Sequence, residues 1–436
     1  MSTVTSEQEE KNSIKNKLNK SDREFHDWYR FVLSYPPQLV RKYIEEFNLT
    51  EDDLLLDPFC GTGTTLVEAK LQNIPSVGME ANQFAHFVSS VKIDWQIDAV
   101  ALMDIAMLIK DLALEELANQ SLSDEVTDGD LPITNLRRLT SEKEKLILKN
   151  SISPLPLHKS LVLLDEIKRY ENTAFYKYLL LAFSHSLVYK ISNLRFGPEV
   201  GIGKLKKDAV VVKAWFEKIV QICLDIQTSK GKDSVGAKAV FFDSRNGMHS
   251  LGKNKVSAVI TSPPYPNEKD YTRTTRLESV ILGFINTKDE LRALKKTLLR
   301  SNTKGVYKGD NDDEYVKDFF QISSIATQIE DKRIALGKTS GFERLYPKVT
   351  KLYFGGIARH LQELKLVLKP NAQLAYVVGD QASYLQVMIP TGKIIADIAQ
   401  SLGYELVRID LFRTRFSTAT KSNLNEEVVI LKWRGY

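Results

Sequence analysis

A serine, two prolines and a tyrosine follow directly on a short, β-branched apolar run. The run is Val256–Thr261, and the chain continues as Ser262-Pro263-Pro264-Tyr265. Two consecutive prolines cannot continue a hydrogen-bonded ladder, so the chain must leave the sheet there in a stiff, extended loop. We therefore expect the loop to hold the Ser262 hydroxyl, the Pro263 carbonyl and the Tyr265 ring around one small pocket.

A second group of residues, nearer the start of the chain, could hold a ligand against a tight turn. In LLLDPFCGTGTT, Asp57 ends an apolar run, Gly61 and Gly63 form the turn, and Thr64 begins a helix. Glycines let the backbone approach a ligand closely, and a helix N-terminus presents free N–H groups to a carboxylate or phosphate. This order predicts a nucleotide-like ligand, and a dinucleotide would also fit it.

Acidic residues end two further apolar runs. Glu80 follows SVGM, and Asp243 follows AVFF. A carboxylate in the position of Glu80 can accept hydrogen bonds from both hydroxyls of a ribose. We expect Asp243 to meet an adenine amino group or to order the site.

Short apolar runs alternate with segments of helical period, which predicts an α/β fold with a doubly wound, mostly parallel sheet. The first five runs are continuously apolar, as buried parallel strands are, and the last two are close enough to form an antiparallel hairpin at the sheet edge. The runs are Leu54–Phe59, Ser76–Met79, Ala239–Phe242, Val256–Thr261, Leu374–Val378, Glu405–Leu411 and Glu427–Leu431.

Two long stretches with apolar residues at helical spacing interrupt this alternation. They predict two largely helical inserts, at 97–236 and 266–352. The core would then comprise 22–96, 237–265 and 353–436, preceded by a disordered segment at 1–21.

The charge of the chain is unevenly distributed. The formal net charge is +5, yet 133–213 holds 15 basic and 7 acidic residues, and 291–308 holds six basic residues and no acid. Such runs suit either a solvated face or contact with a polyanion.

The cysteines, Cys60 and Cys223, offer no disulfide framework and favour a reducing, cytoplasmic compartment. We expect no membrane segment, no secretory signal and, from six scattered histidines, no metal site.

Two motifs are similar to those of a known enzyme family. DPFCGTGTT resembles the cofactor motif, and TSPPY the catalytic motif, of the amino-group DNA methyltransferases, particularly the cytosine-N4 branch. FHDWYRFVLSYPPQLVRKYIEEF resembles the family's segment that packs on the methionine part of the cofactor, and LKPNAQLAYVVGD its fifth-strand motif. The resemblance covers roughly 25–95 and 237–280, with a looser match from 355 onward. Glu80 stands where the family often has Asp, and Asn371 where it often has Gly.

The resemblance implies a Rossmann-like methyltransferase that uses S-adenosylmethionine. It implies catalytic roles for Ser262, Pro263, Pro264 and Tyr265. The implied cofactor-binding residues are Tyr29, Asp57, Pro58, Phe59, Cys60, Gly61, Gly63, Thr64, Thr65, Glu80 and Asp243.

The implied reaction is direct methyl transfer to the amino group of a flipped base in double-stranded DNA. Ser262 Oγ and the Pro263 carbonyl would accept hydrogen bonds from the two amine N–H groups, and Tyr265 would stack on the base. No cysteine nucleophile is required. A serine before PPY favours cytosine N4, in the setting of a restriction-modification system with a cognate endonuclease.

The basic inserts are the expected DNA-binding regions. The residues predicted to contact phosphates are Arg195, Lys204, Lys206, Lys207, Arg300 and Lys304.

Three alternatives stay open at this point. The target could be adenine N6, or the enzyme could modify an RNA base, since similar motifs occur in RNA methyltransferases. The chain could also be a catalytically idle nucleic-acid-binding subunit, although intact Asp57, Glu80, Ser262 and Tyr265 argue against that.

Overall fold

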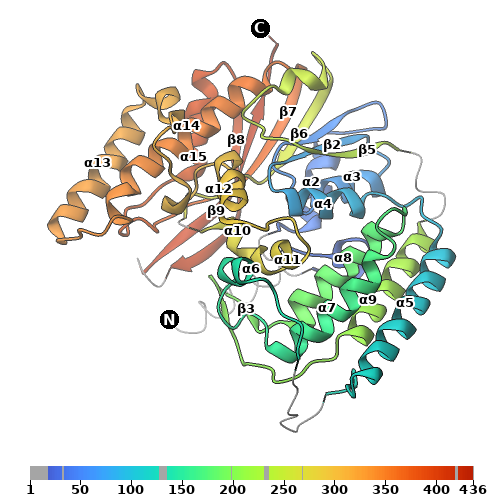
Figure 1. Cartoon of the computed structure of the whole chain (residues 1–436). Coiled ribbons are helices and arrows are strands. Elements are labelled where there is room, and N and C mark those ends of the chain that lie inside the picture. Colours follow the sequence, from blue (N-terminus) through green and yellow to red (C-terminus); the bar gives the residue numbers. More distant parts are fainter. Residues whose placement is uncertain are drawn as a thin grey trace, which may run out of the picture.

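Seven strands form one sheet in the order β5-β2-β1-β6-β7-β9-β8 (Figure 1). The computed structural model describes residues 18–31, 34–126, 135–197, 199–229, 235–267, 269–417 and 421–435. β9 runs antiparallel between β7 and β8, and the other neighbouring strands are parallel. The predicted doubly wound α/β fold with an antiparallel hairpin is therefore confirmed. The strands are Leu55–Asp57 (β1), Ser76–Glu80 (β2), Ala237–Phe241 (β5), Val256–Thr261 (β6), Leu368–Gly379 (β7), Glu405–Ser417 (β8) and Ser422–Lys432 (β9).

The central strands are buried on both faces because they are apolar at consecutive positions. Side chains alternate across a strand, so Ala375 joins the hydrophobic cluster on one face and Tyr376 the cluster on the other. Helices α2 and α3 cover the first face, and α14 and α15 cover the second. The helices packed on the sheet are Pro37–Glu46 (α2), Thr64–Leu71 (α3), Gln83–Lys92 (α4), Tyr346–Leu364 (α14) and Thr391–Ser401 (α15).

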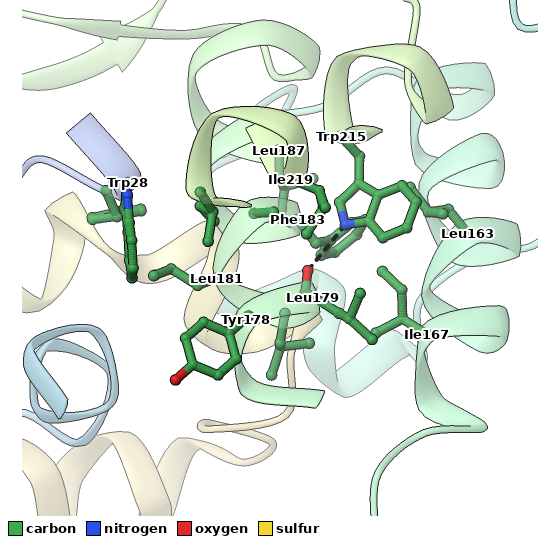
Figure 2. Packing of buried hydrophobic residues seen from close by; sticks show 14 of the residues in the cluster. Trp28, Leu163, Ile167, Tyr178, Leu179, Leu181, Phe183, Leu187, Trp215 and Ile219 are labelled. Carbon is green, nitrogen blue, oxygen red and sulfur yellow. Dashed lines mark hydrogen bonds between the residues drawn. The ribbon is translucent and has the colours of Figure 1, made fainter. Parts of the chain in front are cut away.

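The first insert is a helical bundle whose apolar core is continuous with the core of the sheet region. Its buried residues share one cluster with Trp28 of the N-terminal segment and with Phe84 of α4. Figure 2 shows Trp215 packed in this cluster, where its Nε1–H donates to the Leu179 carbonyl at 3.0 Å. The elements are Ala99–Asn119 (α5), Ser141–Leu146 (α6), Pro154–Lys168 (α7), Tyr176–Ser186 (α8), a π-helical turn Leu187–Ile191 (η3), the hairpin Leu194–Phe196 (β3) and Val200–Ile202 (β4), and Val212–Thr228 (α9).

The second insert packs against α14 at a point where glycine is required. A Cβ built on Gly355 would lie 1.8 Å from the Asp312 carbonyl oxygen, so only a glycine lets the two segments meet. The insert comprises Tyr271–Thr274 (α10), Arg276–Ile281 (α11), Lys288–Thr297 (α12), Phe320–Ala335 (α13) and the 3-10 turns Thr303–Gly305 (η5), Asp312–Val316 (η6) and Glu343–Leu345 (η7). Further 3-10 turns lie at Lys20–Asp22 (η1), His26–Trp28 (η2) and Met248–Leu251 (η4).

One prediction about the strands was wrong. The third apolar run was expected to be buried, but it forms β5 at the sheet edge, beside β2 alone. Lys238 is exposed and Phe241 is 51% exposed, because an edge strand has a neighbour on one side only. The hairpin strands β8 and β9 are also longer than expected, and they extend through most of the segment predicted as their connection.

Part of the predicted disordered terminus, residues 1–17, lies outside the described residues. Among the described helices we find none with the length and apolarity needed to span a bilayer.

Candidate active site

A cavity of about 310 Å³ lies at the carboxyl ends of the parallel strands. This volume falls in the range of about 300–1,000 Å³ that is usual for small-molecule sites. Glycine-turn residues and Glu80 line one part of the cavity, and Ser262, Pro263, Pro264 and Tyr265 line another. The structure thus brings the two sequence motifs to a single cavity.

Asp57 organises the region beneath the cavity and does not line it. Its carboxylate accepts hydrogen bonds from Thr261 Oγ1 at 2.6 Å, from Thr65 Oγ1 at 2.5 Å and from the Phe59 N–H at 3.1 Å. Burial raises the pKa of Asp57 to about 6, against the opposing effect of these bonds. The carboxylate therefore ties β1 to α3 and to β6.

Glu80 joins the end of β2 to the glycine turn. Its Oε2 accepts from the Gly61 N–H at 2.9 Å, and its Oε1 accepts from the Asn82 N–H at 2.7 Å. Burial raises the pKa of Glu80 to about 7. Each carboxylate oxygen can accept a further hydrogen bond. Glu80 lines the cavity and can therefore receive two hydroxyl donors while it holds the turn.

Gly61 has φ of +52°, and a Cβ built on it would have no heavy atom within 4 Å. The turn therefore leaves open space at the cavity wall, in a backbone conformation that favours glycine. Gly63, by contrast, packs below the cavity, where a Cβ would lie 3.1 Å from Ser89 Cβ. Pro58, Phe59, Cys60 and Thr64 also line the cavity.

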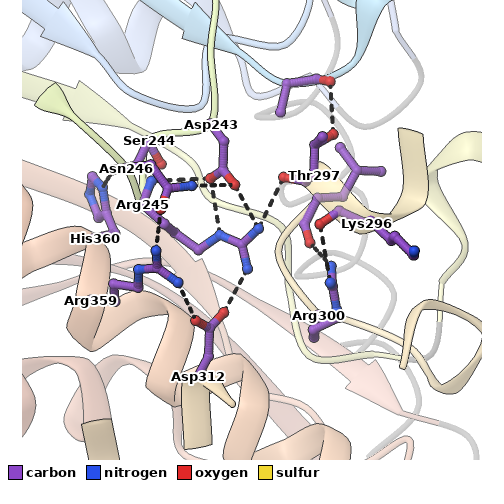
Figure 3. Close-up of polar contacts among 12 residues, drawn as sticks. Asp243, Ser244, Arg245, Asn246, Lys296, Thr297, Arg300, Asp312, Arg359 and His360 are labelled. Atoms are coloured by element: carbon purple, nitrogen blue, oxygen red, sulfur yellow. Dashed lines mark hydrogen bonds and ion pairs between the residues drawn. The ribbon is translucent and has the colours of Figure 1, made fainter. Parts of the chain in front are cut away.

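Asp243 lines the cavity but has its carboxylate engaged by arginine, as Figure 3 shows. Arg245 donates to it through Nε at 3.0 Å and through Nη2 at 2.7 Å. The other terminal nitrogen of Arg245, Nη1, donates to Asp312 of η6 at 2.6 Å. Asp312 also accepts from Arg359 of α14 at 3.0 Å. This network links the Asp243 wall of the cavity to the second insert.

The Ser262–Tyr265 loop is held from two sides. Ser262 Oγ donates to the Val377 carbonyl of β7 at 3.1 Å, and a side-chain hydrogen bond also joins Ser262 to Tyr265. The Tyr265 N–H donates to the Tyr271 hydroxyl at 2.9 Å. Burial, and then the Glu426 carboxylate, raise the pKa of Tyr265, so its phenol is neutral. Tyr271 thus positions the loop backbone.

The predicted cofactor residue Tyr29 is not brought to the cavity. Its side chain is buried, and its hydroxyl donates to Glu278 at 2.5 Å. Phe31, Ser34, Tyr35 and Pro36 line the cavity instead. The Tyr35 hydroxyl donates to Asp57 Oδ2 at 3.3 Å. These residues lie in FVLSYPP, within the same family-like segment as Tyr29. That segment was therefore the sequence feature that could have indicated them.

The basic residues predicted to contact DNA fall into two groups. Arg195, Lys204, Lys207 and Lys304 are exposed. Lys206 is half-buried, and its Nζ donates to the carbonyls of Lys190 at 2.6 Å and Ser192 at 2.8 Å.

Arg300 is buried in the cavity wall rather than exposed. It donates to Asp310 through Nε and Nη2, both at 2.8 Å. Its charge is therefore already paired.

Several cavity residues were not predicted from the sequence. Phe412, Arg413 and Arg415 of β8 and Glu426 of β9 line the part of the cavity near Tyr265. The alternation of aromatic and basic residues in LFRTRF was the only local signal. No group of three or more potential metal ligands is found among the described residues.

Comparisons with known proteins agree with the motifs. A family model described as DNA methylase, of the N6/N4 type, matches residues 3–89. The Type II methyltransferase M.BsoBI of Geobacillus stearothermophilus is 25% identical over 90% of this chain and 81% of its own length. The Type II methyltransferase M.AvaI of Anabaena variabilis is 21% identical over the same shares. The resemblance to the amino-group DNA methyltransferases is confirmed.

Two other matches are more limited. The Type II methyltransferase M.MjaII of Methanocaldococcus jannaschii is 33% identical over 16% of this chain and 13% of its own length. A crystal structure of TrmN from Thermus thermophilus matches with a TM-score of 0.28 and 10% identity. It covers 94% of this chain, which spans 52% of that one.

Proposed function

Since this chain is related to the amino-group DNA methyltransferases, we propose that it transfers a methyl group from S-adenosylmethionine to the exocyclic amine of a flipped DNA base, with cytosine N4 the favoured target. One observation carries the proposal. Glu80, with the Gly61 turn, and the Ser262–Tyr265 loop line the same cavity. A cofactor held at the first group would have its reactive end within reach of a base held at the second.

The cofactor side of the cavity has the donors and acceptors that the cofactor requires. Glu80 would accept the ribose hydroxyls, and the open space beside Gly61 would admit the cofactor close to the backbone. Phe31, Tyr35 and Pro36 would supply apolar walls. Tyr29 would support this segment from beneath through its bond to Glu278, not through direct contact. S-adenosylmethionine, when bound, supplies a methyl group activated by its sulfonium.

The base side of the cavity suits an amine that is a poor nucleophile. The lone pair of a cytosine amine is delocalised into the ring, so the nitrogen must pyramidalise before it reacts. Ser262 Oγ, oriented by its bond to the Val377 carbonyl, would accept a hydrogen bond from one amine N–H, and the Pro263 carbonyl would accept one from the other. The neutral Tyr265 ring would stack on the base. In well-oriented systems such positioning accounts for about 7–11 kcal/mol of the barrier.

Double-stranded DNA would approach over the exposed basic residues of the inserts. Arg195, Lys204, Lys207 and Lys304 are exposed and would contact phosphates. Relatives named Type II methyltransferases support a role in restriction-modification, beside an endonuclease that cuts the same unmethylated site.

Identification of the methylated product tests the proposal. Unmethylated DNA is incubated with the protein and isotopically labelled cofactor, digested to nucleosides, and analysed by mass spectrometry against standards. N4-methylcytosine is the expected product. N6-methyladenine would overturn the base assignment and keep the reaction type, whereas 5-methylcytosine would refute the mechanism. Label found in RNA alone would refute the DNA assignment.

A further inference from the structure

A buried ion pair forms part of the cavity wall beside the catalytic loop. Arg413 of β8 and Glu426 of β9 are cross-strand neighbours. Arg413 Nε donates to Glu426 Oε2 at 2.6 Å, and Arg413 Nη2 donates to Glu426 Oε1 at 2.9 Å. The two side chains are 17% and 10% exposed. The pair is therefore a bidentate, largely desolvated contact rather than a surface salt bridge.

The pair stands directly against Tyr265. A Cβ built on Gly379 of β7 would lie 3.0 Å from Tyr265 Cε2 and 3.2 Å from Glu426 Cγ. The tyrosine ring and the stem of the glutamate thus both lie against the same glycine. The ladder of β8 and β9 shifts register between Leu411 and Arg413. Bulges of this kind redirect a side chain next to a site.

The guanidinium has donors to spare. Glu426 accepts from Nε and Nη2, and within the described residues Nη1 makes no hydrogen bond. One proton of Nη2 and one of Nη1 are therefore available as a parallel pair on the end edge of the guanidinium. The Glu426 carboxylate holds the orientation of this edge and neutralises its charge, so the pair would recognise a ligand by donor geometry.

We propose that Arg413 selects the target base by donating to two adjacent acceptors on its Watson–Crick edge, and that Glu426 is its positioning residue. This inference rests on the proposed function. Cytosine presents N3 and O2 side by side next to its amine, which matches two parallel N–H donors. Adenine presents only N1 beside its amine, followed by a C–H group. With the amine held at Ser262, both Arg413 donors would find acceptors on cytosine. On adenine, one of the two donors would face a C–H group and stay without an acceptor.

A substrate analogue tests the contact directly. Duplexes carry cytosine or 3-deazacytosine at the position that sequencing of the product identifies as methylated. The analogue keeps the amine and O2 but lacks the N3 acceptor. The ratio of kcat/KM for the two duplexes is measured for the parent, for Arg413→Met/Glu426→Gln and for Arg413→Lys. The double variant removes both charges together, because removing one would leave the other buried and unpaired.

A matched control comes from the same strand. Arg408 donates to Asp410 through Nε at 2.8 Å and through Nη2 at 3.1 Å, but this pair is more exposed and does not line the cavity. Arg408→Met/Asp410→Asn should therefore keep the parent's ratio.

The kcat/KM ratio of cytosine to the analogue should be about tenfold or more higher in the parent than in the double variant. A good bidentate contact contributes about that much discrimination. The intrinsic reactivity of the analogue's amine affects all proteins equally and cancels in the comparison. Arg413→Lys keeps the charge with one point donor and should give an intermediate ratio, which decides the matter if the double variant does not fold.

The outcomes separate this inference from the function beneath it. Equal ratios in parent, double variant and Arg413→Lys, with cytosine methylated by all, would overturn the role of Arg413 and leave the proposed function standing. No methylation of DNA by the parent would overturn the proposed function itself. Methylation of adenine by the parent would overturn the cytosine assignment and this inference together.

Discussion

The backbone N–H of Gly61 donates to the Glu80 carboxylate at 2.9 Å and so joins the turn after β1 to the end of β2. The glutamate can receive a ligand only in the geometry that this bond sets. Because burial raises the pKa of Glu80 to about 7, its charge also depends on pH near neutrality.

The affinity for S-adenosylmethionine should therefore fall as the pH decreases from 8 to 6. Ribose hydroxyls donate to the ionised carboxylate, and protonation below about pH 7 removes that acceptor, with a limit of about tenfold per pH unit. The sign for folding is the opposite. A carboxyl with a raised pKa favours the folded state at low pH, and this contribution is lost as the pH rises through about 7. Calorimetric titration across this range measures the affinity, and Glu80→Gln should remove most of its pH dependence. Unchanged pH dependence in Glu80→Gln would assign the effect to another group, such as Asp57.

Gly61→Val should weaken cofactor binding by about tenfold or more. The added side chain would enter the open space at the cavity wall, and the φ of +52° adds strain of about 1–3 kcal/mol. Calorimetry gives the affinity, and circular dichroism checks the fold. The control is Gly201→Val in β4, where a Cβ also has no atom within 4 Å and φ is not positive. Equal cofactor affinity in both variants would contradict the assignment of the turn.

Tyr265→Ala should lower the rate of methyl transfer by about tenfold or more, whereas Tyr265→Phe should stay close to the parent. Stacking of an aromatic ring on a base contributes about 1–3 kcal/mol, and phenylalanine keeps the ring. Single-turnover kinetics with labelled cofactor measure the effect. Comparable losses in the two variants would point to the hydroxyl instead of the ring.

Ser262→Ala should slow chemistry more than it weakens DNA binding. The substitution removes the proposed hydrogen-bond acceptor for one amine N–H, so kcat should fall with little change in KM. Ser257→Ala is the matched control, because Ser257 lies on the same strand β6 but does not line the cavity. A rise in KM alone would show that Ser262 binds substrate without assisting the transfer.

Lys204→Gln/Lys207→Gln should weaken DNA binding and flatten its salt dependence. Both residues are exposed, and each lost phosphate contact should reduce the slope of log affinity against log salt by about 0.9. Lys206 stays intact because its Nζ holds two backbone carbonyls. The control is Lys253→Gln/Lys255→Gln. Both lysines are exposed just before the amino end of β6, whereas the cavity lies at the carboxyl ends of the strands. Equal slopes in the two double variants would show that Lys204 and Lys207 lie on an ordinary solvated surface.

Much of the site could be predicted from local sequence because its key residues follow strands. The carboxyl ends of parallel strands meet at one edge, so Glu80 and the Ser262–Tyr265 loop had to lie on the same side of the sheet once their strands were recognised. Consecutive apolar residues predict burial on both faces, and paired prolines predict departure from the sheet. These are properties of a few neighbouring residues, which is why DPFCGTGTT and TSPPY could be interpreted without coordinates.

Other features depend on partners that are distant in the chain. Local periodicity does not encode strand order, so the edge position of β5 could not be predicted from its apolar run. The sequence predicts Arg300 and Lys206 as phosphate-binding cations. In the fold, Arg300 is paired with Asp310, and Lys206 donates to two backbone carbonyls. Arg413 and Glu426 reach the Tyr265 pocket only because β9 pairs with β7 and β8 together. The chemistry of a charged side chain depends on its solvation and its neighbours, and for these residues both are set by tertiary packing.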